Sequence, residues 1–215
     1  MTWIKICGIT NTEDALTAVE AGADALGFVF YEKSPRKVDP ETAAALISQL
    51  PPSVEKVGVF FNHSERSIHD VVDQAGLTAI QLHGDAEDPQ VADLVTTSHP
   101  ELKVLPAIPM LDPRPESWAM MWSPESVYAF LADSGAGSGR PFDWSATRDA
   151  VETMARRSRV AIAGGLNSHN VAEAIAILHP WGVDVSSGVE ARPGKKDPAK
   201  IKAFIAAVRN ADQVQ

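Results

Sequence analysis

Eight short apolar runs alternate with helical segments along this chain, and this alternation constrains the fold more than any other feature. Each run is mostly apolar or β-branched and is bounded by Gly, Pro, Asn or Asp, as is typical of buried parallel strands. The predicted strands are Trp3–Ile9, Ala25–Tyr31, Val57–Phe61, Ala79–His83, Lys103–Ile108, Val127–Ala132, Val160–Ala163 and Val183–Ser186. Strict alternation of strands and helices predicts parallel strands joined by crossover helices.

Capping signals place several of the intervening helices. Thr10–Glu13 has the spacing of a capping box, and Gly22 lies where that helix is expected to end. The pairs Asp39-Pro40 and Asp197-Pro198 each put a capping carboxylate before a proline in the first helical turn. Further helices are predicted at about 66–75, 86–97, 144–156 and 169–178, with one short helix between Leu111 and Pro124.

Eight strand–helix units within 215 residues favour a single-domain (β/α)8 barrel over residues 1–215. An open, doubly wound sheet is the alternative. With 45% hydrophobic residues, the chain has enough apolar surface for one sizeable core and is too short for two typical domains.

The charge balance excludes several classes of partner. The chain has 19 Lys and Arg residues against 28 Asp and Glu, a net charge of −9, so we expect no broad basic face for a nucleic acid or an anionic membrane. Its single cysteine excludes an intramolecular disulfide and a Cys-rich zinc site. Neither a signal peptide nor an apolar stretch of about 20 residues is visible, so a cytoplasmic protein is expected. We expect a monomer, since no large apolar surface patch can be read from the sequence.

In barrels of this kind the site lies at the C-terminal ends of the strands. Alternation along the first strand points Lys5 and Cys7 inward, with Cys7 nearer the mouth. A lone Cys is most often a small buried hydrophobe, but a thiol at the mouth can act as a base where positive charge favours the thiolate. Asp133 ends the sixth strand and should lie across the mouth from Cys7, unless it serves only as a turn residue.

Three glycine-rich turns follow the sixth, seventh and eighth strands. Exposed backbone amides in such turns and a helix N-terminus form a recurrent phosphate site in this architecture. The helix after the seventh strand could be capped by Asn167 or Ser168. The sequence therefore predicts a phosphorylated ligand held by Gly137, Ser138, Gly139, Gly164, Gly165, Ser187 and Gly188.

Three polar residues are weaker candidates for ligand binding. Arg36 lies in a loop stiffened by Pro35, and its planar guanidinium is suited to a carboxylate. His83 ends the fourth strand, where it could cap the strand or donate to an anion. Asp184 should point inward, either toward ribose hydroxyls or as a buried partner of Lys5. No pair among the six histidines has metal-ligand spacing, so neither a metal nor a cofactor is expected.

Taken together, the motifs resemble those of the phosphoribosylanthranilate isomerases of tryptophan biosynthesis, in order and through nearly the whole chain. The most specific stretches are Lys5–Thr10 and Asp184–Glu190, at opposite ends of the sequence. Others are 27–30, 34–36, 57–60, 81–84, 142–144, 164–167 and 193–197. In that family a longer stretch usually follows the catalytic Asp, whereas here the glycine-rich turn follows Asp133 almost at once.

The resemblance implies an Amadori rearrangement of N-(5-phosphoribosyl)anthranilate, an aminoaldose, to an aminoketose without metal or organic cofactor. It implies that Asp133 is the general acid and Cys7 the general base, and that Arg36 holds the anthranilate carboxylate. The rivals are the analogous isomerisation in histidine biosynthesis, which uses paired Asp residues in a twofold repeat, a Schiff-base aldolase using Lys5, and a barrel that binds phosphosugars without turnover.

Overall fold

The computed structural model describes residues 1–84, 89–135 and 140–213. Eight parallel strands close into a barrel in chain order, with β1 paired to both β2 and β8. The strands are β1 (Trp3–Cys7), β2 (Ala25–Val29), β3 (Glu55–Phe61), β4 (Ala79–His83), β5 (Lys103–Pro109), β6 (Ala129–Asp133), β7 (Arg159–Ile162) and β8 (Gly182–Val185). The barrel prediction is confirmed, and the open sheet is excluded because β1 and β8 pair over four residues of register.

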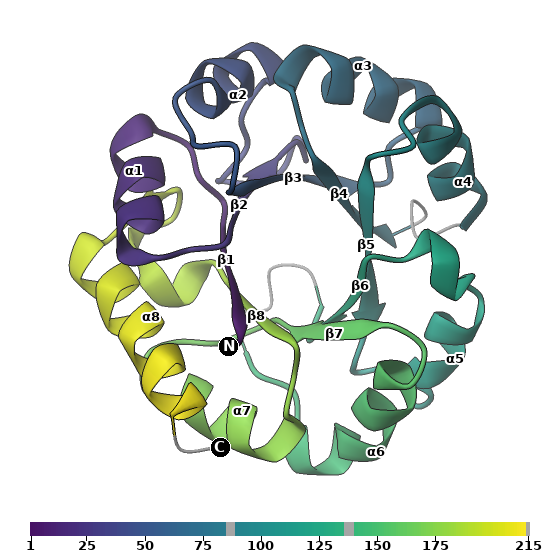
Figure 1. Ribbon diagram of the computed structural model, residues 1–215, viewed down its shortest axis with the longest axis vertical. Helices are drawn as coiled ribbons and strands as arrows, with labels where there is room; N and C mark the ends of the chain where they lie inside the picture. The colour runs from purple at the N-terminus through teal and green to yellow at the C-terminus, as the bar shows by residue number, and fades with distance from the viewer. Residues whose placement is uncertain (85–88, 136–139, 214–215) are drawn as a thin grey trace.

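Helices form a ring outside the strands (Figure 1). They are α1 (Thr12–Ala21), α2 (Pro40–Ile47), α3 (Glu65–Ala75), α4 (Pro89–Ser98), α5 (Pro115–Met120), α6 (Trp144–Ala155), α7 (Val171–Leu178) and α8 (Pro198–Asp212). Most of the core lies between this ring and the barrel, where buried residues such as Phe28, Phe60, Phe130 and Phe204 pack. Smaller apolar clusters fill the barrel interior, as packed barrels require. Among the described residues, no helix has the length and apolar character needed to cross a membrane.

Most predicted helix ends agree with the structure. Asp39 and Asp197 cap α2 and α8 by accepting backbone N–H bonds, and Gly22 ends α1 with a φ of +102°. The capping box is wrong, because Asn11 is the N-cap of α1 and accepts from the Asp14 N–H at 3.0 Å. Thr10 donates its hydroxyl to the Gly194 carbonyl at 2.6 Å, a contact made across the fold.

The predicted cap of α7 is also wrong. Asn170 precedes that helix and makes no side-chain capping bond. Asn167 instead accepts from the His169 N–H at 2.9 Å within the turn, and Asn170 accepts from the Asn167 N–H at 2.8 Å. Both side chains therefore form hydrogen bonds within the turn between β7 and α7, and neither caps the helix.

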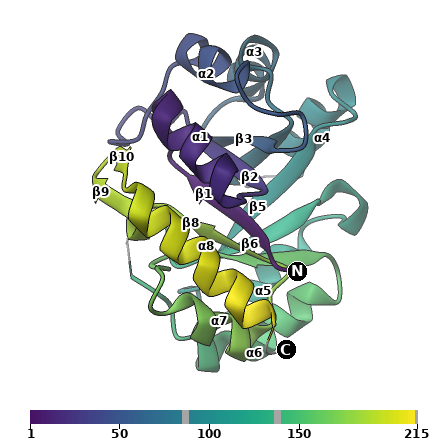
Figure 2. The same cartoon turned by 60° about the vertical axis from the view of Figure 1, so that its left-hand side comes forward.

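A two-stranded antiparallel hairpin lies between β8 and α8. Its strands are β9 (Glu190–Arg192) and β10 (Lys195–Lys196), and the turn between them contains Gly194 at a φ of +79°. Figure 2 shows this hairpin standing off the barrel next to the first turn of α8. The hairpin contacts α1, because the Lys196 N–H donates to the Asp14 carboxylate at 2.8 Å.

Candidate active site

A cavity of about 440 Å³ opens at the C-terminal ends of the barrel strands. Of the predicted site residues, the following line it: Cys7, Arg36, His83, Asp133, Gly164, Gly165, Asp184 and Ser187. Gly188 does not line it, and Gly137, Ser138 and Gly139 lie outside the described residues. The C-terminal ends of the barrel strands therefore bring together residues that are far apart in the sequence.

A buried chain of polar side chains crosses the barrel interior, and its members Gln81, His83 and Asp184 line this cavity. Lys5 is fully buried, and its ammonium group donates to Asp184 at 2.9 Å and to Gln81 Oε1 at 2.7 Å. Burial alone favours the neutral amine, but the Asp184 carboxylate outweighs it and raises the pKa of Lys5 above its ordinary value. Lys5 therefore stays charged, and the predicted alternative role of Asp184 as its buried partner is confirmed.

His83 is connected to the same chain. Because the ammonium group only donates, the Gln81 oxygen must face Lys5, and the Gln81 NH₂ then donates to His83 Nε2 at 2.6 Å. Burial and the nearby Lys5 charge lower the pKa of His83 to about 4. His83 is thus a neutral imidazole with its hydrogen on Nδ1, a hydrogen-bond donor without positive charge at neutral pH.

Cys7 lies at the end of β1, directly above Lys5 on the inward face. Burial raises the pKa of its thiol, and the Asp184 carboxylate adds to that effect. The positive charges of Lys5 and Lys196 and a hydrogen bond from Lys5 partly oppose it. In the folded protein Cys7 is therefore mainly a thiol at neutral pH. It lies where the ammonium groups of Lys5 and Lys196 stabilise the thiolate once it forms.

Asp133 is the last residue of β6 and is 9% exposed. Burial and the charge of Asp184 raise its pKa from 3.8 to about 6. Bonds from the backbone N–H groups of Ser134 and Gly135, and the charge of Lys5, limit that rise. A carboxyl group with this pKa holds or releases a proton near neutral pH, as a general acid must.

The described glycines after β7 and β8 have two different roles. Gly164 and Gly165 have φ values of +86° and +66°, and a Cβ on Gly164 would lie 2.0 Å from the Ser134 hydroxyl oxygen. These two glycines let the backbone approach the cavity closely. Gly188 instead packs on the β7 loop, because a Cβ there would lie 1.9 Å from the Leu166 carbonyl oxygen.

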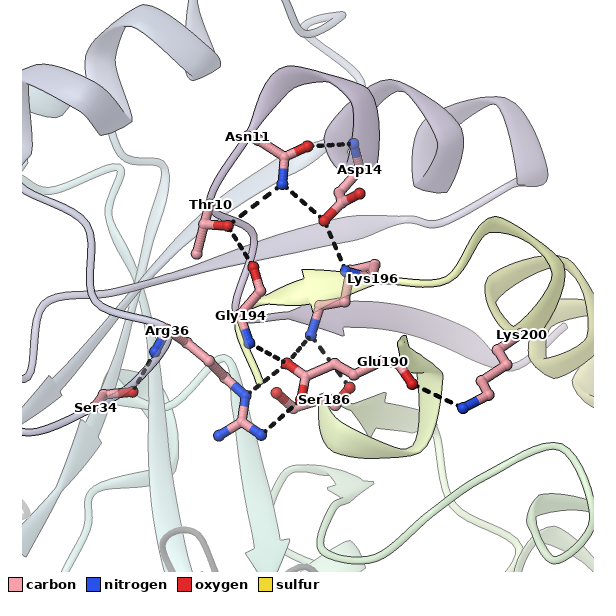
Figure 3. A network of polar contacts seen from close by, with 10 residues as sticks. All are labelled: Thr10, Asn11, Asp14, Ser34, Arg36, Ser186, Glu190, Gly194, Lys196 and Lys200. Carbon is pink, nitrogen blue, oxygen red and sulfur yellow. Dashed lines mark hydrogen bonds and ion pairs between the residues drawn. The ribbon is translucent and has the colours of Figure 1, made fainter. Parts of the chain in front are cut away.

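Arg36 does not stand free over the cavity. Its Nε donates to Glu190 Oε1 at 2.8 Å and its Nη2 to Glu190 Oε2 at 2.9 Å (Figure 3). Glu190 Oε1 also accepts from the fully buried Lys196 ammonium group at 3.1 Å. The carboxylate thus carries one negative charge between two cations, and the cluster keeps a net charge of +1.

Sequence reasoning missed four residues of this region: Gln81, Ser186, Glu190 and Lys196. Gln81 shares the inward face of β4 with His83, a spacing of two that could have indicated it. The Ser186 hydroxyl lines the cavity, and no described residue forms a hydrogen bond with its buried oxygen. Nothing local in the sequence indicates the pairing of Glu190 with Arg36, since 154 residues separate them.

Within the described part of the chain, no three His, Cys, Asp or Glu side chains are arranged to hold a metal ion. The fold and the site together define a (β/α)8-barrel protein whose cavity is lined by a buried carboxyl group, a thiol and the glycines of the turn after β7. A family model described as "N-(5'phosphoribosyl)anthranilate (PRA) isomerase" matches residues 4–207. The chain belongs to the N-(5'-phosphoribosyl)anthranilate isomerase family.

Relatives of known family match the sequence over nearly the whole chain. The chain is 48% identical over 207 residues to the N-(5'-phosphoribosyl)anthranilate isomerase of Pelobacter propionicus, covering 94% of this chain and 93% of that protein. It is 43% identical over 209 residues to the isomerase of Thermotoga neapolitana, covering 95% and 97%. The resemblance noted from the motifs is therefore confirmed.

Solved structures of the family share the fold. The phosphoribosyl anthranilate isomerase of Thermus thermophilus superposes with a TM-score of 0.85 at 36% identity, covering 97% of this chain and 99% of that one. A second, at a TM-score of 0.83 and 42% identity over 98% and 100%, is in complex with reduced 1-(o-carboxyphenylamino)-1-deoxyribulose 5-phosphate. A third, with the same scores and coverage, is described as monomers of the dimeric enzyme of Thermotoga maritima.

Proposed function

We propose that this chain isomerises N-(5'-phosphoribosyl)anthranilate in tryptophan biosynthesis, with Asp133 as general acid and Cys7 as general base. The observation that carries the assignment of roles is that Cys7 and Asp133, from strands β1 and β6, line one cavity. Asp133 protonates the furanose ring oxygen, the ring opens, and a Schiff base forms between C1 and the anthranilate nitrogen. Cys7 then takes the proton from C2, and the enolamine that results tautomerises to the aminoketose.

The protonation states of the two groups limit how this proceeds. Between a pKa of about 6 for Asp133 and a raised pKa for Cys7, the two groups together hold one acidic proton, mainly on sulfur. Catalysis needs the other arrangement, thiolate with carboxylic acid. Burial and Asp184 favour the protonated Asp133, and the charges of Lys5 and Lys196 favour the thiolate, while burial of Cys7 and the charge of Asp184 oppose the thiolate.

The remaining cavity residues divide the substrate between them. We assign the anthranilate carboxylate to Arg36, whose side chain is 19% exposed and lines the cavity. We assign the phosphate to the turns after β6, β7 and β8, where Gly164, Gly165 and Ser187 line the cavity. Asp184 and neutral His83 remain for the ribose hydroxyls or the anthranilate ring.

The test is turnover of freshly prepared N-(5'-phosphoribosyl)anthranilate, followed by loss of its fluorescence. Cys7→Ser and Asp133→Asn should each lower kcat by a factor of about 10² to 10⁴, the usual contribution of one acid or base. Asp149→Asn, on the exposed face of α6, is the control and should keep the full rate. Asp133→Asn at full rate would assign the acid to another residue, and absence of turnover in the unaltered protein would exclude the activity.

We also propose a location and an oligomeric state for this chain. We propose a cytoplasmic location, in line with membership of this isomerase family. We propose a monomer, although one relative is described as dimeric. Sedimentation equilibrium over a range of concentrations distinguishes the two states by mass.

A further inference from the structure

We infer that Glu190 is a positioning residue that fixes the guanidinium of Arg36 for a substrate carboxylate, and that the β9–β10 hairpin holds both residues in place. This inference rests on the proposed role of Arg36. Glu190 does not line the cavity that Cys7 and Asp133 line, so its effect on the substrate must pass through Arg36.

The contact leaves one particular edge of the guanidinium for the ligand. Arg36 uses the side edge, Nε and Nη2, on the two oxygens of Glu190, at 2.8 Å and 2.9 Å. A guanidinium has five N–H donors in a planar fork, so the end edge formed by Nη1 and Nη2 keeps a matched pair. No described residue accepts a hydrogen bond from Nη1. A carboxylate in the cavity can therefore dock on this end edge with two parallel bonds.

Glu190 is itself fixed on every side. Its side chain is 5% exposed, and Oε1 accepts from Lys196 at 3.1 Å and from the Gly194 N–H at 3.3 Å, besides Arg36. Lys196 also donates to the Ser186 carbonyl at 3.1 Å at the end of β8 (Figure 3). Lys196 supplies the second positive charge, so Glu190 orients Arg36 without cancelling the positive charge that a carboxylate needs.

Two glycines hold the rest of the arginine. Gly8, which follows Cys7, has a φ of +78°, and a Cβ there would lie 2.6 Å from Arg36 Cδ, so the stem of the arginine runs across this glycine. Gly194 faces the loop that carries Arg36, because a Cβ there would lie 2.7 Å from the Pro35 carbonyl oxygen. The hairpin thus fixes the Arg36 loop through the backbone at Gly194, and it fixes the Arg36 guanidinium through the Glu190 carboxylate.

Fixing the side chain before the substrate arrives favours binding. A free arginine loses several rotamers when it pairs with a ligand, and that loss opposes binding. With the fork already held by Glu190, little of this loss remains. The arrangement predicts that Glu190 acts on substrate binding and on selection of a ring that carries a carboxylate, and not on proton transfer.

The experiment compares Glu190→Gln with the unaltered protein on two substrates, N-(5'-phosphoribosyl)anthranilate and N-(5'-phosphoribosyl)aniline, which lacks the carboxylate. Glu190→Gln should raise KM for the anthranilate substrate by about tenfold, the effect of losing one strong interaction, with kcat within about threefold. On the aniline substrate the two proteins should agree within about twofold. An equal loss on both substrates would show a structural role and overturn the inference.

Two further variants separate the inference from the proposed function. Arg36→Met should show the same selective loss, and Arg36→Met combined with Glu190→Gln should be no worse than Arg36→Met alone, since the two residues act as one unit. If Arg36→Met is not selective for the carboxylate, the proposed role of Arg36 fails. If Arg36→Met is selective and Glu190→Gln is not, the inference alone fails.

Controls keep the result interpretable. Glu13→Gln removes an exposed carboxylate that pairs with Lys195 of the same hairpin at 2.8 Å, and it should leave KM for both substrates unchanged. Gly194→Ala tests the hairpin without touching any charge, and should raise KM for the anthranilate substrate only. If Glu190→Gln folds poorly, as thermal unfolding would show, Gly194→Ala decides: an unchanged KM overturns the role of the hairpin.

Discussion

The ammonium group of Lys5 lies 2.9 Å from the carboxylate of Asp184 inside the barrel, and both side chains are buried. Together they cancel in charge, and each of them acts on both Cys7 and Asp133. Lys5 favours the thiolate of Cys7, and Asp184 favours the protonated form of Asp133. Each charge has the opposite effect on the other residue, since Asp184 raises the pKa of Cys7 and Lys5 lowers the pKa of Asp133.

Breaking this ion pair from one side should destabilise the fold. Lys5→Met leaves the Asp184 carboxylate buried without a cation, which typically costs about 3–5 kcal/mol in the free energy of unfolding. Lys5→Met with Asp184→Asn should recover part of that loss, because no charge then remains unpaired. Urea unfolding measures both, with Arg148→Gln in an exposed pair as a control expected to cost under about 1 kcal/mol. Equal losses for the single and double variants would contradict the expected coupling.

The pH dependence of kcat/KM should show one acidic limb. The active form needs one proton shared by Asp133 and Cys7, so the rate should rise as pH increases through about 6 and then stay level until the thiol ionises. Asp184→Asn removes the charge that raises the pKa of Asp133, so the limb should move to lower pH. The substrate phosphate also titrates at about pH 6 but would not follow this substitution. A limb that stays in place in Asp184→Asn assigns it to the phosphate.

Asp133 should make stability fall as pH rises. Its pKa is higher in the folded chain, about 6 against 3.8, so between these values the folded state holds a proton that the unfolded state has released. Stability is therefore lost from about pH 4 to 6, by up to about 3 kcal/mol for a shift of about two units. Asp133→Asn should raise Tm by several degrees at pH 7.5 and by almost nothing near pH 4, as calorimetry would show. The same Tm gap at both values would exclude the buried carboxyl as its cause.

A methyl group at Gly164 should impair the site. Its φ of +86° disfavours any side chain, and the added Cβ would press on Ser134, the neighbour of Asp133. Gly164→Ala should therefore lower kcat/KM by at least about tenfold, the effect of losing about 1.4 kcal/mol in the transition state. Gly76→Ala is the matched control, since its φ is +71° but the nearest atom would be 3.9 Å away, far from the cavity. It should lose about 1–2 kcal/mol of stability and keep its kcat/KM. Similar activity losses in both variants would point to backbone strain in general.

Much of this molecule follows from local patterns in the sequence. Alternation along β1 places Lys5 and Cys7 inside the barrel, and the strand-end rule places Asp133 opposite, because both depend only on period and on strand direction. Contacts between distant segments are a different matter. Thr10 and Asn11 are both residue types that cap helices, and in the fold Asn11 caps α1 while the Thr10 hydroxyl donates to the distant Gly194 carbonyl. For the same reason Arg36 appears free in sequence but is paired with Glu190 in the fold.

The closure of the barrel also depends on a strand that is synthesised near the end of translation. Strand β1 pairs on its second edge with β8, and Arg36 pairs with Glu190 of the hairpin that follows β8. A nascent chain that has not yet released residues 182–196 from the ribosome presents two unpaired sheet edges, which invite association with other chains. Its arginine is also still free to rotate. The closed barrel and the pairing of Arg36 with Glu190 are therefore both completed by segments close to the C-terminal end of the chain.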